Sequence, residues 1–99
     1  MPTIPFEDEE IYDALKTLSG WEHQDNHLVK TYVVPTYLSG LTFAAAIGTL
    51  AEAADHHPDL YIGYKKVRVE LTTHDAGYRV SRKDVELATA IEGLHYPRP

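Results

Sequence analysis

Residues 52–75 read EAADHHPDLYIGYKKVRVELTTHD, and they contain the end of one predicted helix and the whole of one predicted hairpin. A proline disfavours helical geometry at the residue that precedes it. Pro58 therefore predicts that the helix ends near Asp55 or His56 and that the chain continues in an extended conformation. Three of the six histidines of the chain lie in this interval.

The extended part of this stretch predicts two antiparallel strands. Leu60–Tyr64 forms the first, and a turn around residues 63–65 leads into the second, Lys66–Thr73. Apolar residues occupy every other position of the second strand (Val67, Val69 and Leu71), which is the period of a half-buried strand. An antiparallel hairpin returns to its own start, so we expect His74 to lie near residues 56–58.

Capping signals and periodicity predict the other elements. Thr36 is suited to cap the middle helix, whose apolar residues recur at three- and four-residue steps. Ser81 and Asp84 have the spacing of a capping box. In chain order, the remaining predicted elements are a helix over Phe6–Ser19, strands over Trp21–Gln24 and His27–Val34, a helix after Thr36, and a helix that ends around Gly93.

The predicted order is α-β-β-α-β-β-α, with no internal repeat and no linker. Two hairpins with interspersed helices favour an α+β fold in which helices cover one face of an antiparallel sheet. Ninety-nine residues is the size of one domain, so we expect a single domain over residues 1–99 with an ordered core over residues 6–94. Exposed sheet edges in so small a protein favour homo-oligomers.

Composition restricts the compartment and the partners. The absence of cysteine excludes a disulfide framework and a cysteine-based metal site, and it fits the cytoplasm, where we expect the protein. The acidic N-terminal residues are unlike a signal peptide. Residues 41–54, the longest apolar stretch, are better explained as a packed helix than as a membrane span. A net charge of −6 opposes binding to phosphate backbones, so nucleic acid is not an expected direct partner.

The candidate site consists of Glu52, His56, His57 and His74. Glu52 and His56 are four residues apart on the predicted helix, so the carboxylate is expected to orient the His56 ring. His57 follows in extended geometry, where adjacent side chains diverge. Imidazoles give and take protons near neutral pH, and a cluster without a serine or cysteine nucleophile suits proton transfer better than covalent catalysis.

Two other interpretations of these residues remain open. Each histidine, taken alone, is more simply a hydrogen-bonded polar group at the end of an element. A zinc site is the rival function, since glutamate and histidine are zinc ligands. The chain lacks both an HExxH motif and a close pair of histidines at helical spacing, which disfavours zinc.

At these residues the chain resembles the pterin-4a-carbinolamine dehydratases, small enzymes of pterin recycling whose animal members also act as dimerisation cofactors of a homeodomain transcription factor. The similarity runs from about Leu18 to Leu94. The matching pattern is Glu52-x-x-x-His56-His57-Pro58, then Tyr64-x-Lys66-Val67-x-Val69-x-Leu71-x-Thr73-His74-Asp75, then Ser81-x-x-Asp84, with Gly20-Trp21 upstream. His-His-Pro alone would be weak, but the combination is specific.

The resemblance implies a four-stranded antiparallel sheet with three helices, assembled as homodimers or homotetramers. It also implies a 4a-hydroxytetrahydrobiopterin dehydratase, which removes water from a 4a-hydroxytetrahydropterin to give the quinonoid dihydropterin without a metal or organic cofactor. His57 would be the principal acid and base. His56 and His74 would bind and polarise the pterin, one of them assisting the leaving hydroxyl, and Glu52 would orient His56.

By the same resemblance, Asp75 and Asp84 match positions at the pterin site, although Asp84 equally fits a helix cap, and Pro58 shapes the site without chemistry. The chain departs from the family at Gly77–Val80, where a shorter glycine-rich link is usual, and this leaves the substrate preference open. A second function class is a non-enzymatic dimerisation or assembly factor with the same fold. Such a factor would not need three histidines, so their presence favours the enzyme.

Overall fold

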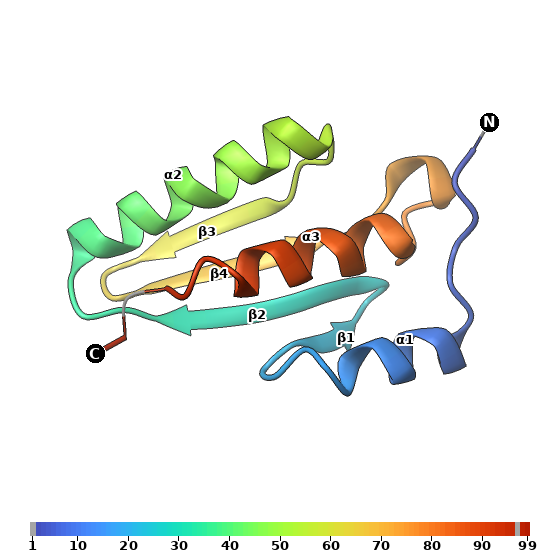
Figure 1. Cartoon of the computed structure of the whole chain (residues 1–99), viewed down its shortest axis with the longest axis horizontal. Coiled ribbons are helices and arrows are strands. Elements are labelled where there is room, and N and C mark those ends of the chain that lie inside the picture. Colours follow the sequence, from blue (N-terminus) through green and yellow to red (C-terminus); the bar gives the residue numbers. More distant parts are fainter. Residues whose placement is uncertain (1, 97) are drawn as a thin grey trace.

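The structure is a computed structural model that describes residues 2–96 and 98–99, and it has the predicted α+β order (Figure 1). The helices are α1 (Asp8–Leu15), α2 (Tyr37–Ala54) and α3 (Arg82–Glu92), and a short 3-10 helix, η1 (His74–Ala76), precedes α3. The strands are β1 (Glu22–Gln24), β2 (His27–Val33), β3 (Asp59–Gly63) and β4 (Lys66–Leu71).

The four strands form one antiparallel sheet in the order β1-β2-β4-β3. The two hairpins are joined where β2 pairs with β4, with Leu28 opposite Leu71. In the β3–β4 hairpin Asp59 lies opposite Glu70. The beginning of β3 therefore lies beside the end of β4, as predicted, and the residues that flank the hairpin are brought together.

One face of the sheet carries the core, and α2 and α3 lie across it (Figure 1). Along β4 the buried side chains alternate with more exposed ones, as the period of two predicts. Trp21 is buried in the core. Its ring packs edge to face on Tyr32, and Tyr32 packs in the same way on Phe43, with ring centroids 6.3 and 4.9 Å apart.

Helix α2 begins and ends at recognisable backbone signals. Thr36 and Ser39 form a reciprocal capping box at its start, which confirms the predicted cap. Asp55 follows its last turn in the left-handed region, with φ 49° and ψ 44°. By length and composition α2 could cross a membrane, but Phe43 and Ile47 are buried in the core beneath it. It is thus the packed helix predicted from residues 41–54.

The predicted bounds of α1 were too wide at both ends. The helix ends at Leu15 instead of Ser19, because residues 16–18 continue as tight turns with hydrogen bonds to the carbonyl three residues before. Phe6 precedes the helix in an extended arm, where its N–H donates to the carbonyl of Val80 at 2.8 Å. The N-terminal arm is therefore attached to the loop that precedes α3.

Strand β4 also ends earlier than predicted, at Leu71 instead of Thr73. Beyond it, the N–H of Thr73 donates to the carbonyl of Arg79 at 3.0 Å, outside the ladder that β4 forms with β2 and β3. His74 consequently lies on η1, outside the strand. It keeps its predicted place near the start of β3, because η1 follows β4 directly.

The C-terminal end of α3 is tied to the sheet by Glu92. Its carboxylate accepts hydrogen bonds from Trp21 Nε1 at 3.3 Å, from Lys30 Nζ at 2.9 Å and from the Tyr32 hydroxyl. Burial would raise the pKa of Glu92, but the hydrogen bonds from Tyr32 and Lys30 outweigh it and hold this pKa below its ordinary value. Burial and the bond to Glu92 raise the pKa of the Tyr32 hydroxyl well above its usual range.

Candidate active site

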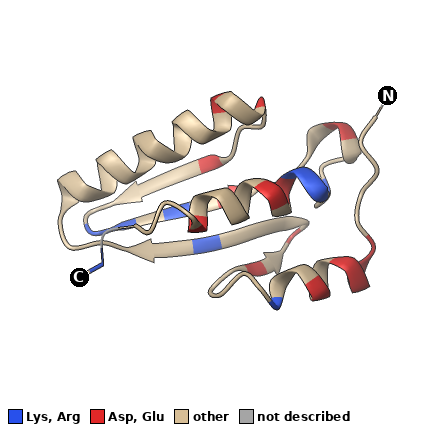
Figure 2. Cartoon of the chain, viewed as in Figure 1, with Lys and Arg blue, Asp and Glu red and all other residues tan. Residues whose placement is uncertain are grey.

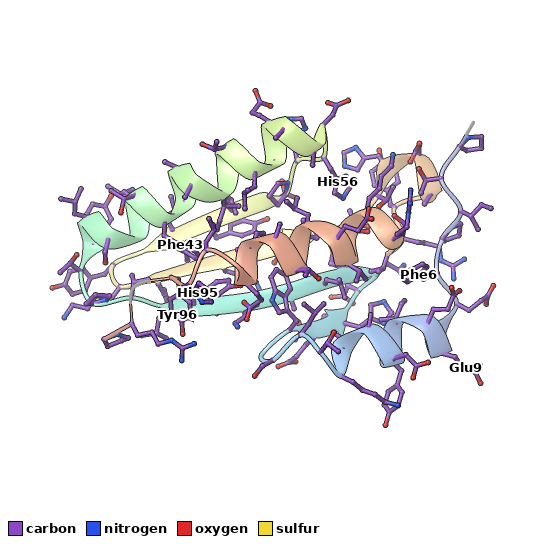
Figure 3. All side chains as sticks on the ribbon, viewed as in Figure 1. Phe6, Glu9, Phe43, His56, His95 and Tyr96 are labelled. Atoms are coloured by element: carbon purple, nitrogen blue, oxygen red, sulfur yellow. The ribbon has the colours of Figure 1, made fainter. Side chains whose placement is uncertain are left out.

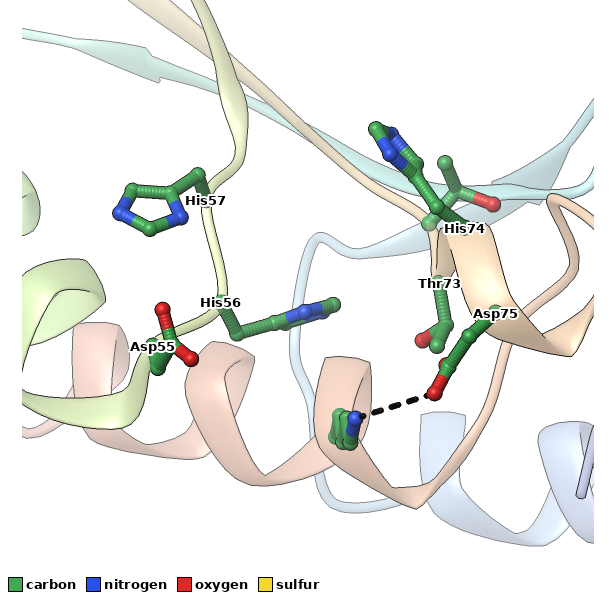
Figure 4. Close-up of a pocket in the computed structure, with 8 residues that line it drawn as sticks. Asp55, His56, His57, Thr73, His74 and Asp75 are labelled. Carbon is green, nitrogen blue, oxygen red and sulfur yellow. Dashed lines mark ion pairs between the residues drawn. The ribbon is translucent and has the colours of Figure 1, made fainter. Parts of the chain in front are cut away.

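A pocket of about 220 Å³ opens where β3 begins and β4 ends, against the start of α3. Its walls come from the end of α2, the residues after β4 and the first turn of α3 (Figure 4). The lining residues are Asp55, His56, His57, Thr72, Thr73, His74, Asp75 and Lys83. The three predicted histidines and Asp75 therefore border one pocket.

His56 has a different partner from the one predicted. Its Nε2 lies 2.6 Å from Oδ1 of Asp84, whose side chain is fully buried at the start of α3. The expected pairing with Glu52 was wrong. The left-handed backbone at Asp55 ends α2, so the four-residue stacking that would join Glu52 to His56 is lost. Figure 3 shows His56 between the end of α2 and the start of α3.

Asp84 links the cap of α3 to the pocket. Its Oδ2 accepts from the Thr73 hydroxyl at 2.7 Å and from the Ser81 N–H at 2.9 Å, while Oδ1 faces His56. Asp84 thus closes the predicted capping box and also holds a pocket residue. When the carboxylate is ionised, Nε2 of His56 must donate, which leaves Nδ1 of a neutral ring as an acceptor.

His57 takes the carboxylate that His56 was expected to have. Its Nε2 lies 2.5 Å from Oε2 of Glu52, and both side chains are largely exposed. Figure 4 shows the rings of His56 and His57 pointing in different directions, as extended geometry predicts for adjacent residues. The Glu52 carboxylate orients the His57 ring and leaves its second nitrogen available for proton exchange with solvent or a ligand.

Helix η1 places His74 and Asp75 on the opposite wall. The His74 ring is exposed and packs against Tyr78, with ring centroids 4.7 Å apart. Asp75 accepts from the Thr3 hydroxyl at 3.1 Å and lies 3.8 Å from Nζ of Lys83, the ion pair dashed in Figure 4. The hydrogen bond from Thr3, which outweighs desolvation, and the charge of Lys83 lower the pKa of the Asp75 carboxyl.

The remaining predicted site residues lie outside the pocket lining. Glu52 and Asp84 reach the pocket through the two histidines that they bind. Pro58 is half-buried and directs the chain from His57 into β3.

Four pocket residues were not predicted from the sequence: Asp55, Thr72, Thr73 and Lys83. Thr73 precedes His74 in the strand motif, and Lys83 lies inside the Ser81-x-x-Asp84 box. Both residues lie within the quoted motifs, but neither side chain has a chemistry that singles it out as an acid–base group. The sequence holds no local signal for Thr73, because its bond to Asp84 joins residues 11 apart in the chain. Figure 2 shows that the first turn of α3, which carries Lys83, is basic, in contrast to the acidic α1.

The pocket can supply protons, accept them and bind polar groups. Within the described ranges, residues 2–96 and 98–99, no three histidine, aspartate or glutamate side chains converge in the way that a metal ion would need. Imidazoles stand on both walls, two of them fixed by carboxylates, and Asp75 and Lys83 add one charge of each sign. This set of groups suits acid–base chemistry on a small polar molecule.

Comparison with known proteins decides the family. The family described as pterin 4 alpha carbinolamine dehydratase matches residues 4–94. This chain belongs to that family. A member from Roseiflexus sp. (strain RS-1), named "Putative pterin-4-alpha-carbinolamine dehydratase", is 46% identical over 87 residues, which cover 88% of this chain and 92% of the relative.

Solved structures place this pterin-4a-carbinolamine dehydratase family member in the same fold. A transcriptional coactivator/pterin dehydratase from Brucella melitensis matches it with a TM-score of 0.85 and 26% identity, over 91% of this chain and 97% of its own. A pterin dehydratase-like protein, described as a RuBisCO assembly factor in the alpha-carboxysome, matches with a TM-score of 0.65 and 20% identity, over 79% and 92%. At that identity the second match concerns the fold alone. The family and the fold expected from the resemblance are therefore confirmed.

Proposed function

We propose that this chain is a 4a-hydroxytetrahydropterin dehydratase, a hydro-lyase that forms the quinonoid dihydropterin. The observation that carries the proposal is a single pocket bordered by His56, His57 and His74, two of which are bonded to carboxylates. Dehydration of this kind is proton transfer, and imidazole is the side chain best suited to it near neutral pH. Membership of the dehydratase family supports the same class of reaction.

The elimination consists of two proton transfers on one molecule. The C–O bond at position 4a breaks, and the hydroxyl receives a proton and leaves as water. The neighbouring ring N–H gives up a proton, and its electron pair forms the new C=N bond. Atoms and charge balance without an oxidant or a reductant, so two positioned acid–base groups are sufficient.

His57 is our choice for the principal acid and base. Its ring is oriented by Glu52 and remains largely exposed at the pocket, so it can return to its starting protonation state through water after each turnover. Glu52 acts as the positioning residue, for His57 in place of His56. The carboxylate also stabilises the imidazolium that forms when His57 accepts a proton.

His56 and His74 bind and polarise the pterin from opposite walls of the pocket. Asp84 binds the His56 ring, and Thr73 and the Ser81 N–H hold the Asp84 carboxylate in place. The His56 ring therefore has one preferred orientation. His74 stands on η1, where it can assist the leaving hydroxyl.

Asp75 and Pro58 complete the proposed site. Asp75 is a carboxylate at neutral pH even at its ordinary pKa, which is lowered further here, so it can accept hydrogen bonds from the N–H groups of a pterin ring. Asp84 contributes to substrate binding through His56. Pro58 fixes the direction of the chain after His57 and takes no part in the chemistry.

A non-enzymatic assembly factor is the second candidate function. A protein with this fold is described as a RuBisCO assembly factor, so the fold can serve that purpose. The buried Asp84–His56 pair and the three imidazoles around one pocket favour the enzyme, because an assembly surface requires neither.

We also propose that the chain forms homodimers or homotetramers. Large apolar side chains are exposed on α2 and on β3, which is an edge strand. They are Tyr37, Leu38, Leu41, Tyr61 and Ile62. Light scattering coupled to size-exclusion chromatography measures the assembly directly, and a monomer at micromolar concentration would contradict this part of the proposal.

The test of the activity is dehydration of a 4a-hydroxytetrahydropterin generated in situ and followed by ultraviolet absorbance. The wild type should accelerate the reaction over its uncatalysed background, and His57→Ala should reduce that acceleration by about 100-fold. His23→Ala, which removes an exposed histidine of β1 outside the pocket, is the matched control and should keep the full rate. No acceleration by a folded wild type would overturn the dehydratase assignment, whereas a rate kept by His57→Ala would move the acid–base role to His56 or His74.

A further inference from the structure

The segment between η1 and α3 holds an unusual backbone at Tyr78. Gly77 has φ +74° and Tyr78 has φ +59°, so two consecutive residues lie in the left-handed region. Glycine adopts this region freely, whereas a bulky aromatic residue is rarely found there. Tyr78 is also 62% exposed, so burial of its ring does not compensate for the backbone strain.

Local hydrogen bonds close this segment onto the pocket wall. The N–H of Tyr78 donates to the carbonyl of Thr73 at 3.0 Å, and the N–H of Thr73 donates to the carbonyl of Arg79 at 3.0 Å. The chain therefore makes a tight loop around His74, anchored at a residue that also bonds to Asp84. The left-handed turn at Gly77 and Tyr78 reverses the chain, so the Tyr78 ring lies against His74 of η1.

The consequence of this turn is a contact between two rings. The Tyr78 ring packs on the His74 imidazole with centroids 4.7 Å apart and an angle of 34° between the planes. His56 and His57 are each oriented by a carboxylate, but His74 has no such hydrogen-bonded partner among the described residues. For this exposed imidazole the tyrosine ring is the orienting contact.

We propose that Tyr78 is a positioning residue that fixes the ring plane of His74 at the pocket. This role rests on the proposed dehydratase function, because it matters only if His74 acts on the substrate. It gives a purpose to the strained turn in the Gly77–Val80 segment, the part of the chain that departs from the usual family pattern. Tyr78 does not line the pocket, so it acts through His74 without touching the pterin.

Tyr78→Gly removes the tyrosine ring and also removes the backbone strain at this position. A fall in rate without a fall in stability would therefore come from the loss of the ring contact with His74. We expect the midpoint of urea unfolding to stay the same or rise, because glycine accepts a positive φ without strain. We expect kcat to fall about three- to tenfold, the effect of losing one aromatic pair, with little change in KM. Tyr78→Phe keeps the ring and should retain the wild-type rate. Tyr64→Gly removes another exposed tyrosine, in the β3–β4 turn, and is the matched control.

The second readout is the NMR spectrum of the His74 ring, assigned with His74→Gln. The nearby tyrosine ring should displace the His74 ring protons in the wild type and in Tyr78→Phe, and this displacement should disappear in Tyr78→Gly. Unchanged His74 signals in Tyr78→Gly, or a full rate in that variant, would overturn the proposal. The spectrum needs no substrate, so a wild type without dehydratase activity would overturn the proposed function while the NMR result still decides whether Tyr78 orients His74.

Discussion

Each end of α3 carries a carboxylate that joins the helix to other elements, yet the two ends differ in what their partners can do. At the start of the helix, Asp84 binds His56, Thr73 and the Ser81 N–H. At the other end, Glu92 accepts from the side chains of Trp21, Lys30 and Tyr32. Figure 3 places His56 and Tyr96 near these opposite ends of the helix.

The difference lies in proton chemistry and access. Asp84 holds a histidine that borders a pocket, and imidazole is the side chain best suited to proton transfer. Glu92 holds a lysine, an indole and a tyrosine whose pKa is raised above its ordinary value, and none of these groups lines the pocket. The two networks therefore differ in one respect that matters for a reaction: only the Asp84 network contains an imidazole that borders the pocket. We expect the Glu92 end to contribute stability alone.

Among substitutions of the two carboxylates, the larger effect is expected from Asp84→Asn. The amide has the same size, and its oxygen can keep the two bonds that Oδ2 accepts from Thr73 and the Ser81 N–H, but an NH2 donor then replaces Oδ1, so His56 Nε2 can no longer donate to an anion there. We expect the free energy of unfolding to fall by about 2 kcal/mol. We also expect the dehydration rate to fall about tenfold or more, because the His56 ring loses the anion that orients it. Urea unfolding and the ultraviolet assay measure the two effects, and a full rate in the folded variant would reduce Asp84 to a helix cap.

Glu92→Gln should lower the stability of the chain without lowering its dehydration rate, in contrast to Asp84→Asn. Loss of the charged acceptor is expected to lower the free energy of unfolding by about 1 kcal/mol, because Lys30 and Tyr32 lose their charge-assisted hydrogen bonds. The dehydration rate of the folded variant should stay within about twofold of wild type, since no catalytic group moves. Glu86→Gln, an exposed position on the same helix, is the control and should leave both quantities unchanged.

If Glu92→Gln reduced the rate as much as Asp84→Asn does at equal folded fraction, the contrast between the two ends would be lost. The comparison requires only that both variants are assayed well below their unfolding midpoints. Circular dichroism under the assay conditions verifies that they are folded.

The Glu92 network also predicts a pH dependence of stability. The pKa of Glu92 is lower in the folded chain than its ordinary value, so the network contributes fully above the unfolded pKa of about 4.3 and is lost as the pH falls through the folded value. The difference in urea midpoint between wild type and Glu92→Gln should therefore be constant near neutral pH and shrink below about pH 4.3. A difference that persists undiminished in acid would show that the contribution of Glu92 is not electrostatic.

The smallest effect is expected at the pocket edge, from Thr3→Val. The Thr3 hydroxyl is the main cause of the lowered pKa of Asp75, so its loss should raise that pKa toward the ordinary value. Lys83 remains near Asp75 and should keep part of the lowering. NMR titration of the Asp75 carboxyl measures the change, and the urea midpoint should not move because the contact is exposed. An unchanged pKa would assign the lowering to Lys83 instead.

Local sequence signals predicted the elements well because each signal acts within a few residues. Pro58, Thr36 and the Ser81-x-x-Asp84 box fixed helix ends in the correct places, and alternation predicted β4. The errors at α1 and at the end of β4 occurred where the backbone continues in tight turns, which have helix-like or strand-like composition without the corresponding hydrogen bonds.

The partners of the histidines could not be predicted in the same way. The expected Glu52–His56 pair assumed that the helix continues to His56. Asp55 instead ends the helix in a left-handed conformation, and the Glu52 carboxylate contacts the next histidine, His57. The contact of His56 with Asp84 joins residues 28 apart in sequence. Only the packing of α3 beside the end of α2 creates it, and no local pattern encodes that packing.

The role of the three pocket histidines is tested most directly by the initial rate of 4a-hydroxytetrahydropterin dehydration, measured for wild type and for single histidine variants that are all folded. We expect alanine at His56, His57 or His74 to lower the rate, with about a 100-fold loss for His57→Ala, and alanine at His23 or His95 to leave it unchanged. Equal rates for all five variants, or no acceleration by wild type over the uncatalysed reaction, would contradict the assignment of this pocket as the site of the reaction.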